Sequence, residues 1–518
     1  MRERPERIIL TRGGLKVARH WLQAGDCSAA SFYLRQLLES TDISVGELES
    51  AFALADRCFD PRHLATMLRP FFNLHWNHPG MQACAAQIES CAANMEFARV
   101  ACQRWDSCQP ANPYPRAEWL RLSLFDDLFT GGQYIVNARA WGSRFFAARS
   151  VVKPRSLRPP WRVGYVSQSF TSLPRASLIR PILELHNPDY FKIYCYVTGH
   201  PICQAEFPKV EWRDAASLNP SQLVQAMGDD HIDIAVNVDG LMDVTSLAAF
   251  AIGCAPEQLA LPNYFASTGL DCFDSRLSHP AIESPAEWQS QYSEPLFSCS
   301  VPPYTYSPPA FMPPLRDAPF YRNGYLTVGF FNSALKWTPP CFELLSSLLE
   351  ACPNVRLLLH CPGLDGQLAQ DFLQKTCPQP ALRSRVRTVG SLSHWDHLDL
   401  HNHVDLMIDS YPLGGATTTL EALWMGRSVL TLAGPGLRSG FTAYALHELS
   451  LVGFTAQSPA QWLNLAIEYA IGRLLPAPDE LRRRFQGSAL MNHSNWIDGL
   501  ETWFFHRATK LQYKGNLP

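Results

Sequence analysis

The sequence predicts an α/β protein with two doubly wound lobes, preceded by an all-α region. Residues 1–155 show helical spacing of apolar residues and almost no strand-like alternation. From about Pro159 onward, short β-branched runs alternate with helix-length segments, which is the pattern of parallel sheets. A proline-rich passage at 301–324 interrupts this alternation. Because proline fits neither a sheet centre nor a helix interior, we interpret the passage as a semi-rigid connector between the lobes.

The all-α domain is assigned to residues 1–155. Stretches such as 15–40 have helical spacing that is broken by short turns. Small residues recur near aromatic ones, at Ala29, Ala30, Tyr33, Ala51, Ala53 and Ala55. This pattern hints at degenerate helix-pair repeats, but no regular period supports more than an all-α assignment.

The two lobes follow from two series of predicted strands. The first lobe, 156–310, contains RVGYVS (162–167), FKIYCYVT (191–198) and IDIAVNV (232–238). The connector itself is assigned to 311–324. The second lobe, 325–480, contains LTVGFF (326–331), VRLLLH (355–360), RVRTVG (385–390), VDLMID (404–409) and SVLTL (428–432). Two consecutive lobes of this kind predict an enzyme with a cleft between them.

The last segment, 481–518, is predicted to be helical. Its apolar side carries an aromatic cluster made of Trp496, Trp503, Phe504 and Phe505. We expect a helix of this composition to pack back across the lobes.

Composition narrows the class of protein. A hydrophobic content of 47% with 18% charged residues fits a globular protein and excludes a disordered one. The net charge of −3 gives no general attraction to nucleic acid or anionic membrane. We find neither a signal-peptide pattern nor an apolar run of membrane-span length, so a cytoplasmic location is expected. The 15 scattered cysteines include no CxxC pair and are interpreted mostly as reduced thiols, with disulfides as the alternative.

A glycine turn followed by three threonines is the most informative motif, YPLGGATTTLEALWMG at 411–426. It follows the predicted strand 404–409 and opens a helix, so free backbone N–H groups lie at the carboxyl edge of the sheet. Gly414 and Gly415 allow close backbone approach. This arrangement is suited to a phosphate group.

The helix itself adds polar groups to this corner. The hydroxyls of Thr417 and Thr418 supply further donors, and Glu421 lies one turn later on the same face, where it could bind ribose hydroxyls. The alternative is a threonine N-cap over an ordinary helix.

Lys336 follows the end of the predicted strand 326–331 in the same lobe. Lysine is scarce in this region, since no other occurs between Lys209 and Lys375. A compact ammonium group at the carboxyl end of a strand suits a diphosphate. The alternative is a solvated surface lysine.

Four histidines in SHWDHLDLHNH, namely His394, His397, His401 and His403, raise the question of a metal site. Three of them could share one helix face. However, no carboxylate-rich or cysteine partner set accompanies them, and a diphosphate held by lysine and a helix end needs no metal. We therefore favour a histidine that stacks on a base, or an exposed helix face, and expect no metal cofactor.

Six segments together resemble the catalytic region of the O-GlcNAc transferase/SPINDLY glycosyltransferases. They are RVGYVSQSF (162–170), IDIAVNVDG (232–240), CAPEQLALPNYFASTG (254–269), QYSEPL (291–296), FNSALK (331–336) and the block 404–434. That family has the two-lobed GT-B fold, and the helical region here takes the place of its longer TPR superhelix. The resemblance implies a bacterial member with a shortened, TPR-like N-terminal domain.

The resemblance also implies a function. It is inverting, metal-independent transfer of a sugar, GlcNAc or a related hexose, from a UDP-sugar to a protein side chain, with Ser or Thr hydroxyls expected. By position, Lys336 matches the family's catalytic diphosphate lysine, His397 the histidine that stacks on uracil, and Glu421 the usual ribose aspartate. The expected nucleotide-sugar site consists of Asn332, Lys336, His397, Gly415, Thr417, Thr418 and Glu421.

Departures from the family pattern lie at the sugar and acceptor end. Leu173 and Ser177 stand where the family has histidines, one of which is a candidate base. Pro262 and Asn263 alter the donor-sugar wall, to which Ser333, beside the lysine, is also assigned. A further change near the donor site is Gly440, where an arginine is expected.

Asp239 or Ser167 could replace the missing base, because both follow strands that end near the cleft. The same departures keep two alternatives open: a nucleotide-binding partner protein without catalysis, and a transferase for a non-protein acceptor. In a bacterial setting, flagellin or another surface protein would be a suitable acceptor. The residues leave the donor sugar open.

Overall fold

The computed structural model describes residues 77–518 with short gaps. The gaps are 92–93, 151, 153–157, 171–175, 200–206, 473, 516–518 and parts of 363–378; before residue 77 only 15–21 and isolated positions are described. Most of the region in which helix-pair repeats are expected, and Leu173, therefore lie outside the described residues.

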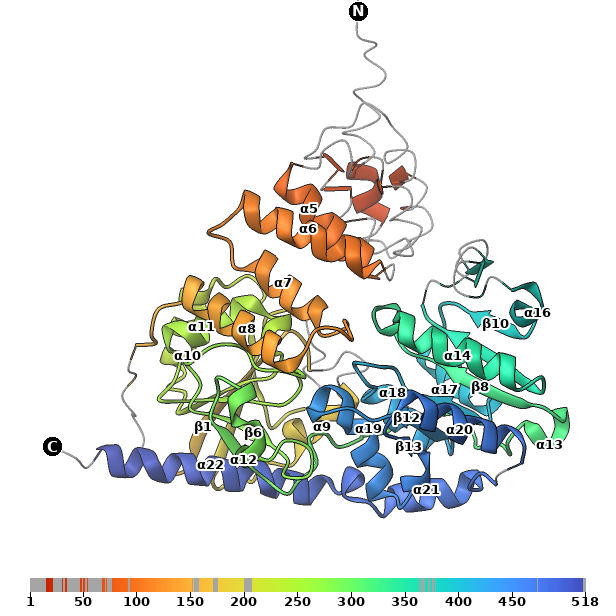
Figure 1. The fold of residues 1–518 in the computed structure, drawn as a ribbon. Helices are drawn as coiled ribbons and strands as arrows, with labels where there is room; N and C mark the ends of the chain where they lie inside the picture. The colour runs from red at the N-terminus through yellow and green to blue at the C-terminus, as the bar shows by residue number, and fades with distance from the viewer. Residues whose placement is uncertain are drawn as a thin grey trace, which may run out of the picture.

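Within residues 77–160, the described part of the chain contains four helices before the first sheet. They are α5 (Pro79–Cys91), α6 (Met95–Cys108), α7 (Tyr114–Ser123) and α8 (Gly131–Phe145). Helix α8 begins at a capping box, in which Thr130 and Gln133 each accept a hydrogen bond from the other's backbone N–H. Figure 1 shows α7 and α8 beside the first lobe, with α5 and α6 above them.

The first lobe contains a seven-stranded parallel sheet with strand order β3-β2-β1-β4-β5-β6-β7. The strands are β1 (Trp161–Ser167), β2 (Phe191–Val197), β3 (Glu211–Asp214), β4 (Ile234–Asn237), β5 (Glu257–Ala260), β6 (Ser275–Ser278) and β7 (Leu296–Ser298). The helices are α9 (Ala176–Glu184), α10 (Pro220–Asp229), α11 (Val244–Ile252) and α12 (Pro285–Trp288).

Successive side chains of this sheet enter two different cores. Tyr165 and Cys195 join one core with α9, while Val166 and Tyr196 join a second core with α8, α10 and α11. Because both faces are covered, the central strands are continuous apolar runs rather than alternating ones.

The second lobe contains a six-stranded parallel sheet with order β10-β9-β8-β11-β12-β13. Its strands are β8 (Leu326–Phe330), β9 (Val355–His360), β10 (Val386–Val389), β11 (Leu406–Ile408), β12 (Ser428–Leu432) and β13 (Thr455–Ala456). Its principal helices are α14 (Pro339–Ala351), α16 (Pro380–Arg383), α17 (His394–Leu400), α18 (Thr417–Trp424), α19 (Gly436–Glu448), α20 (Pro459–Ala470) and α21 (Pro478–Gln486).

The predicted fold class is confirmed by these two parallel, helix-covered sheets. All eight strands predicted from sequence are present, each within two residues of its expected bounds. The proline-rich passage begins inside the core, in residues assigned to the first lobe and not to the connector 311–324. Tyr304 and Tyr306 are fully buried there, and the Tyr306 N–H donates to the carbonyl of Leu490 at 2.8 Å.

The chain returns to the first lobe through α22 (His493–Gly515), which runs along the base of that lobe in Figure 1. Phe504 and Phe505 meet Phe191 at ring-centroid distances of 5.7 and 5.2 Å, and Phe505 also meets Trp161 at 5.5 Å. The helix thus closes the core on the α9 side of the sheet. Edge-to-face aromatic pairs of this kind add about 0.5–1.5 kcal/mol each beyond burial.

Two chemical features follow for the described part of the chain. Its cysteines are all free thiols, as the sequence analysis expects. None of its helices combines the length and apolar character needed to cross a bilayer.

Candidate functional site

A cavity of about 800 Å³ lies between the lobes, where polar side chains follow the carboxyl ends of strands of both sheets. Its described lining from the first lobe and connector includes Gln168, Ser169, Asn263, Phe265 and Tyr304. The second lobe contributes Asn332, Ser333, Lys336, His360, His394, His397, Thr417, Thr418 and Glu421. The structure therefore brings most of the predicted site residues to one cavity.

Helix α18 starts at the cavity wall. Its N-cap residue is Ala416, which has no side chain able to cap the helix, so the threonine N-cap alternative does not apply. Thr417 and Thr418 line the cavity, and the Thr418 hydroxyl donates to the side-chain Oδ1 of Asn332 at 3.3 Å. The first N–H groups of any helix lack intrahelical partners, so this end is suited to an anion.

Lys336 lies at the same corner. It ends a short 3₁₀ turn, Ala334–Lys336, and its Nζ donates to the Gly414 carbonyl at 2.5 Å. Burial lowers the pKa of Lys336 to about 8, although Asp409 and Cys341 act in the opposite direction. The ammonium group is thus part of the cavity wall and not of a solvated outer surface.

Gly415 is expected to approach the ligand, but the structure places its N–H elsewhere. That N–H donates to Asp409 Oδ1 at 2.6 Å, and the Thr431 hydroxyl donates to Asp409 Oδ2 at 3.0 Å. A Cβ at Gly415 would lie 2.6 Å from the Thr419 hydroxyl oxygen. The glycine is therefore required by internal packing of the turn, with Asp409 as the anchor beneath it.

Glu421 is buried and lies between two histidines. Its Oε1 is 2.9 Å from His394 Nε2, and its Oε2 is 3.3 Å from His397 Nε2. Burial alone would raise the pKa of Glu421, but the hydrogen bonds from His394 and His397 outweigh it and lower the pKa to about 2. The carboxylate that the sequence assigns to ribose hydroxyls is therefore already engaged, and it orients the two imidazoles.

The low pKa of Glu421 predicts an acid-dependent loss of stability. The folded-state pKa of about 2 lies below the ordinary value of 4.5, so the stabilisation is present above pH 4.5 and is lost as pH falls toward 2. We expect Glu421→Gln to lack about 2–3 kcal/mol of this pH-dependent stability. Chemical denaturation at several pH values would measure it. Glu480→Gln, at an exposed carboxylate paired with Arg484, is the control and should behave as the parent chain does.

The other histidines have separate environments. His397 packs against His360, with a ring-centroid distance of 5.0 Å. Burial, aided by His397, lowers the pKa of His401 to about 3, so it is a neutral core residue. His403 is exposed near Asp399. Within the described residues, no three His, Cys, Asp or Glu side chains are arranged to hold a metal ion.

The three residues predicted for the donor-sugar wall, Pro262, Asn263 and Ser333, have different positions. Asn263 lines the cavity, and its buried Nδ2 has no hydrogen-bond partner among the described residues. Pro262 borders a small neighbouring cavity instead, and its carbonyl accepts from the Tyr304 hydroxyl at 2.7 Å. Ser333 lies exposed on the rim. Phe265, Tyr304 and His360 are among the lining residues that were not predicted from sequence, because nothing in their local pattern distinguishes them from core residues.

Known proteins resemble the chain at the level of both sequence and fold. The model of glycosyl transferase family 41 matches residues 150–302. SPINDLY proteins of Oryza sativa and Arabidopsis thaliana, each described as a probable UDP-N-acetylglucosamine--peptide N-acetylglucosaminyltransferase, are 27% identical over 77% and 73% of this chain. The chain is similar in sequence to the O-GlcNAc transferase/SPINDLY glycosyltransferases.

The similarity extends to the architecture. A solved structure of a mutant O-GlcNAc transferase from Thermobaculum terrenum matches 99% of this chain and 100% of its own, with a TM-score of 0.88 and 21% identity. That likeness supports the GT-B-like fold. The chain spans less than half the length of the plant family members, 45% and 43% respectively.

The two residues that strand position suggested as a replacement base, Asp239 and Ser167, are not among the described residues that line the cavity. Asp239 is completely buried, and it accepts hydrogen bonds from the Gln168 N–H at 2.7 Å and the Ser167 hydroxyl at 3.0 Å. It supports the loop after β1 and does not face the cavity, so it is unsuited to act as a base. Ser167 and Ser177 are also buried, and Leu173 is outside the described residues.

Proposed function

We propose that the protein is an inverting, metal-independent glycosyltransferase that moves a sugar from a UDP-sugar to a protein hydroxyl of Ser or Thr. One observation carries the proposal: the Lys336 ammonium and the N-terminus of α18 meet at one corner of the cavity between the lobes. The names of the plant relatives, which specify UDP-N-acetylglucosamine and peptide, support this choice of donor and acceptor.

The chemistry needs stabilisation of a leaving diphosphate. The acceptor oxygen forms a bond to the anomeric carbon from one face while the bond to the diphosphate breaks on the other, which inverts the configuration. Lys336 and the N–H groups of α18 then neutralise the charge that develops on the diphosphate. Each such preorganised contact is typically worth about 3–4 kcal/mol in the transition state. These groups supply the positive charge that a divalent cation supplies in metal-dependent transferases.

The donor sugar would occupy the part of the cavity near Asn263. A sugar hydroxyl or an acetamide carbonyl oxygen there would satisfy the buried Asn263 Nδ2. His397 lines the same cavity from the second lobe, and the resemblance expects it to stack on the base.

A second cavity supports a protein acceptor. It has a volume of about 930 Å³ and lies between the helices α5–α7 and the first lobe, and it shares Gln168 with the donor cavity. Its polar lining includes Glu118, Arg121 and Asp243. A space of this size beside the donor cavity suits an extended peptide with its hydroxyl directed to the sugar.

The lysine makes donor binding pH-dependent. The protonated form of Lys336 binds a diphosphate, and its pKa is about 8 in the free protein, so UDP affinity should fall as pH rises through 8. We expect UDP to bind about tenfold more weakly at pH 9 than at pH 7. Isothermal titration calorimetry would measure the change. The weaker UDP affinity of Lys336→Met should vary much less with pH between 7 and 9. If the pH profile of UDP binding were the same in Lys336→Met as in the parent chain, Lys336 would not be the group that binds the diphosphate.

Ligand-induced thermal stabilisation and transfer assays test the proposed function. UDP at about 100 times its dissociation constant should stabilise the protein by about 2.7 kcal/mol, whereas GDP and CMP should not. Labelled sugar should then pass from the UDP-sugar to protein in a lysate, with and without EDTA. A melting temperature that UDP leaves unchanged would overturn the donor assignment, and loss of transfer with EDTA would overturn metal independence.

A nucleotide-binding partner protein without catalysis is the second candidate. One observation favours it: among the described lining residues, Glu421 is the sole carboxylate of the donor cavity, and both of its oxygens are taken by histidines. UDP binding without transfer to any lysate protein would select this candidate.

A further inference from the structure

Arg438 joins the second lobe to the N-terminal helices. It lies in the first turn of α19, and its guanidinium group donates to three backbone carbonyls in the loop between α7 and α8. The acceptors are the carbonyl oxygens of Leu124 at 2.8 Å, Asp126 at 2.7 Å and Phe129 at 2.9 Å. The planar, multi-donor fork of arginine suits three acceptors at once, which lysine cannot reproduce.

The backbone of the same residue supports the corner of the cavity formed by Lys336, Gly414 and the N-terminus of α18, which we call the diphosphate corner. The Arg438 carbonyl accepts from the Gly414 N–H at 2.8 Å, and the Gly414 carbonyl accepts from Lys336 Nζ at 2.5 Å. On the helical side, Arg99 of α6 forms an ion pair with the Asp126 carboxylate. A continuous series of hydrogen bonds therefore runs from α6 to the ammonium group in the cavity.

A second contact supports the other half of the corner. Leu335, the neighbour of Lys336, packs against the apolar cluster of the N-terminal helices, which includes Met81, Cys84 and Leu122. The lysine and the glycine turn are thus both supported by the helical region. Arg438 itself is not among the described residues that line the cavity.

We propose that Arg438 is a positioning residue that couples the N-terminal helical region to the diphosphate corner. Through it, the state of the helical region sets how well Gly414 and Lys336 are placed for the donor, and donor binding in turn tightens the α7–α8 loop, since coupling between two sites is reciprocal. The inference rests on the proposed diphosphate site.

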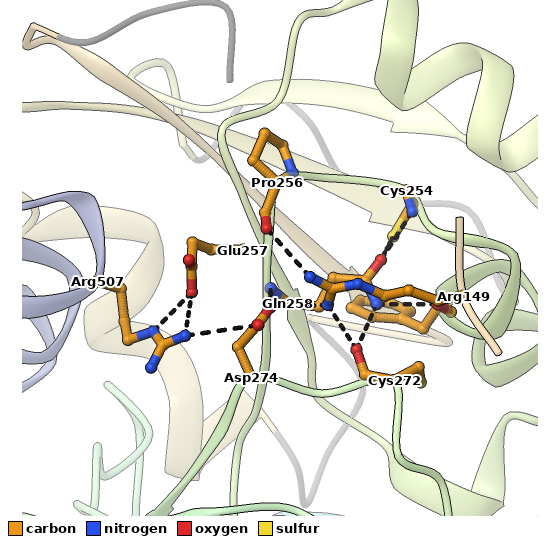
Figure 2. A network of polar contacts seen from close by, with 9 residues as sticks. Arg149, Cys254, Pro256, Glu257, Gln258, Cys272, Asp274 and Arg507 are labelled. Carbon is orange, nitrogen blue, oxygen red and sulfur yellow. Dashed lines mark hydrogen bonds and ion pairs between the residues drawn. The ribbon is translucent and has the colours of Figure 1, made fainter. Parts of the chain in front are cut away.

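The first test compares UDP affinity in Arg438→Met and a matched control. Arg149→Met is that control, because Arg149 also donates to backbone carbonyls, those of Cys272 and Pro256, in addition to the Asp274 carboxylate (Figure 2). We expect Arg438→Met to weaken UDP binding about five- to tenfold, Arg438→Lys to restore part of the affinity, and Arg149→Met to lower the melting temperature without changing affinity.

The second test uses hydrogen exchange of the parent chain and remains decisive if Arg438→Met fails to fold. UDP should slow amide exchange in residues 124–130 as well as in 412–419, and Arg149→Met should retain both effects. Equal UDP affinity in folded Arg438→Met, or protection confined to 412–419, would overturn the coupling while leaving the donor site intact. Absence of UDP binding by the parent chain would instead overturn the proposed function itself.

Discussion

Replacing Lys336 with methionine should lower kcat for sugar transfer by about 10²–10³-fold, because a donor to the departing diphosphate is lost. The fold should persist. Methionine fills a similar volume, and its thioether avoids the cost of burying an ammonium group whose pKa burial has already lowered to about 8. Steady-state kinetics with labelled UDP-sugar, together with a melting curve, would measure both effects.

Lys192→Met is the appropriate control for this experiment. Lys192 is an exposed lysine on β2, paired with Glu211 at 3.1 Å, and it does not line the cavity between the lobes. Its removal should leave kcat unchanged. If Lys336→Met retained the parental kcat at saturating donor, the assignment of Lys336 as the leaving-group cation would be wrong.

Replacing Arg507 with methionine should destabilise the first lobe by about 3–5 kcal/mol, the largest stability effect that we expect. Arg507 on α22 donates to Glu257 Oε2 at 2.6 Å and lies 3.6 Å from Asp274 Oδ1 (Figure 2). Glu257 is completely buried. Without Arg507, Glu257 would be a buried carboxylate that has lost its cationic partner. The free-energy cost of leaving that charge without its partner is much larger than the stabilisation that the intact pair provides.

A double-mutant cycle would separate these contributions. Glu257→Leu combined with Arg507→Met should recover much of the lost stability, because both charges are then removed together. Urea unfolding followed by tryptophan fluorescence would measure the free energies. The exposed pair Arg180–Glu184 provides the comparison, and its disruption should cost less than about 1 kcal/mol. A similar small loss for Arg507→Met would contradict the prediction.

The fold could be predicted because its central strands carry their information locally. Runs such as 191–198 and 404–409 are apolar on both faces, and turn residues bound them. The short strands β3, β6 and β7 escaped prediction because they contain polar sequences such as EWRD and SRLS. Their strand conformation comes from pairing with a neighbour that is already in place.

The meeting of Lys336 and the threonines of α18 at one cavity was also accessible from sequence, for a related reason. Lys336 and the threonines of α18 each follow a strand, and parallel strands bring their carboxyl ends to one edge. The pairing of Glu421 with His394 and His397 was not accessible, because it joins α17 and α18 across the cavity. Helical spacing describes one helix face and contains no information about which residues face each other between helices.

The acceptor end was predicted least well. Asp239 was expected near the cleft because it follows β4. Its carboxylate instead accepts one hydrogen bond from the Ser167 hydroxyl and one from the Gln168 backbone N–H, at the end of β1. The position of a residue after a strand predicts where its backbone lies, but not the direction in which its side chain points. Arg438 gave no signal either, since its three acceptors are carbonyls about 310 residues earlier in the chain.

The return of α22 to the first lobe has a consequence for biosynthesis. While the ribosome is still making the second lobe, Trp161 and Phe191 are present without Phe504 and Phe505, so one face of the first sheet is exposed to solvent. The first lobe can complete its core only after residues near 508 have emerged. A nascent chain that stalls before that point would present a broad aromatic surface to chaperones and proteases.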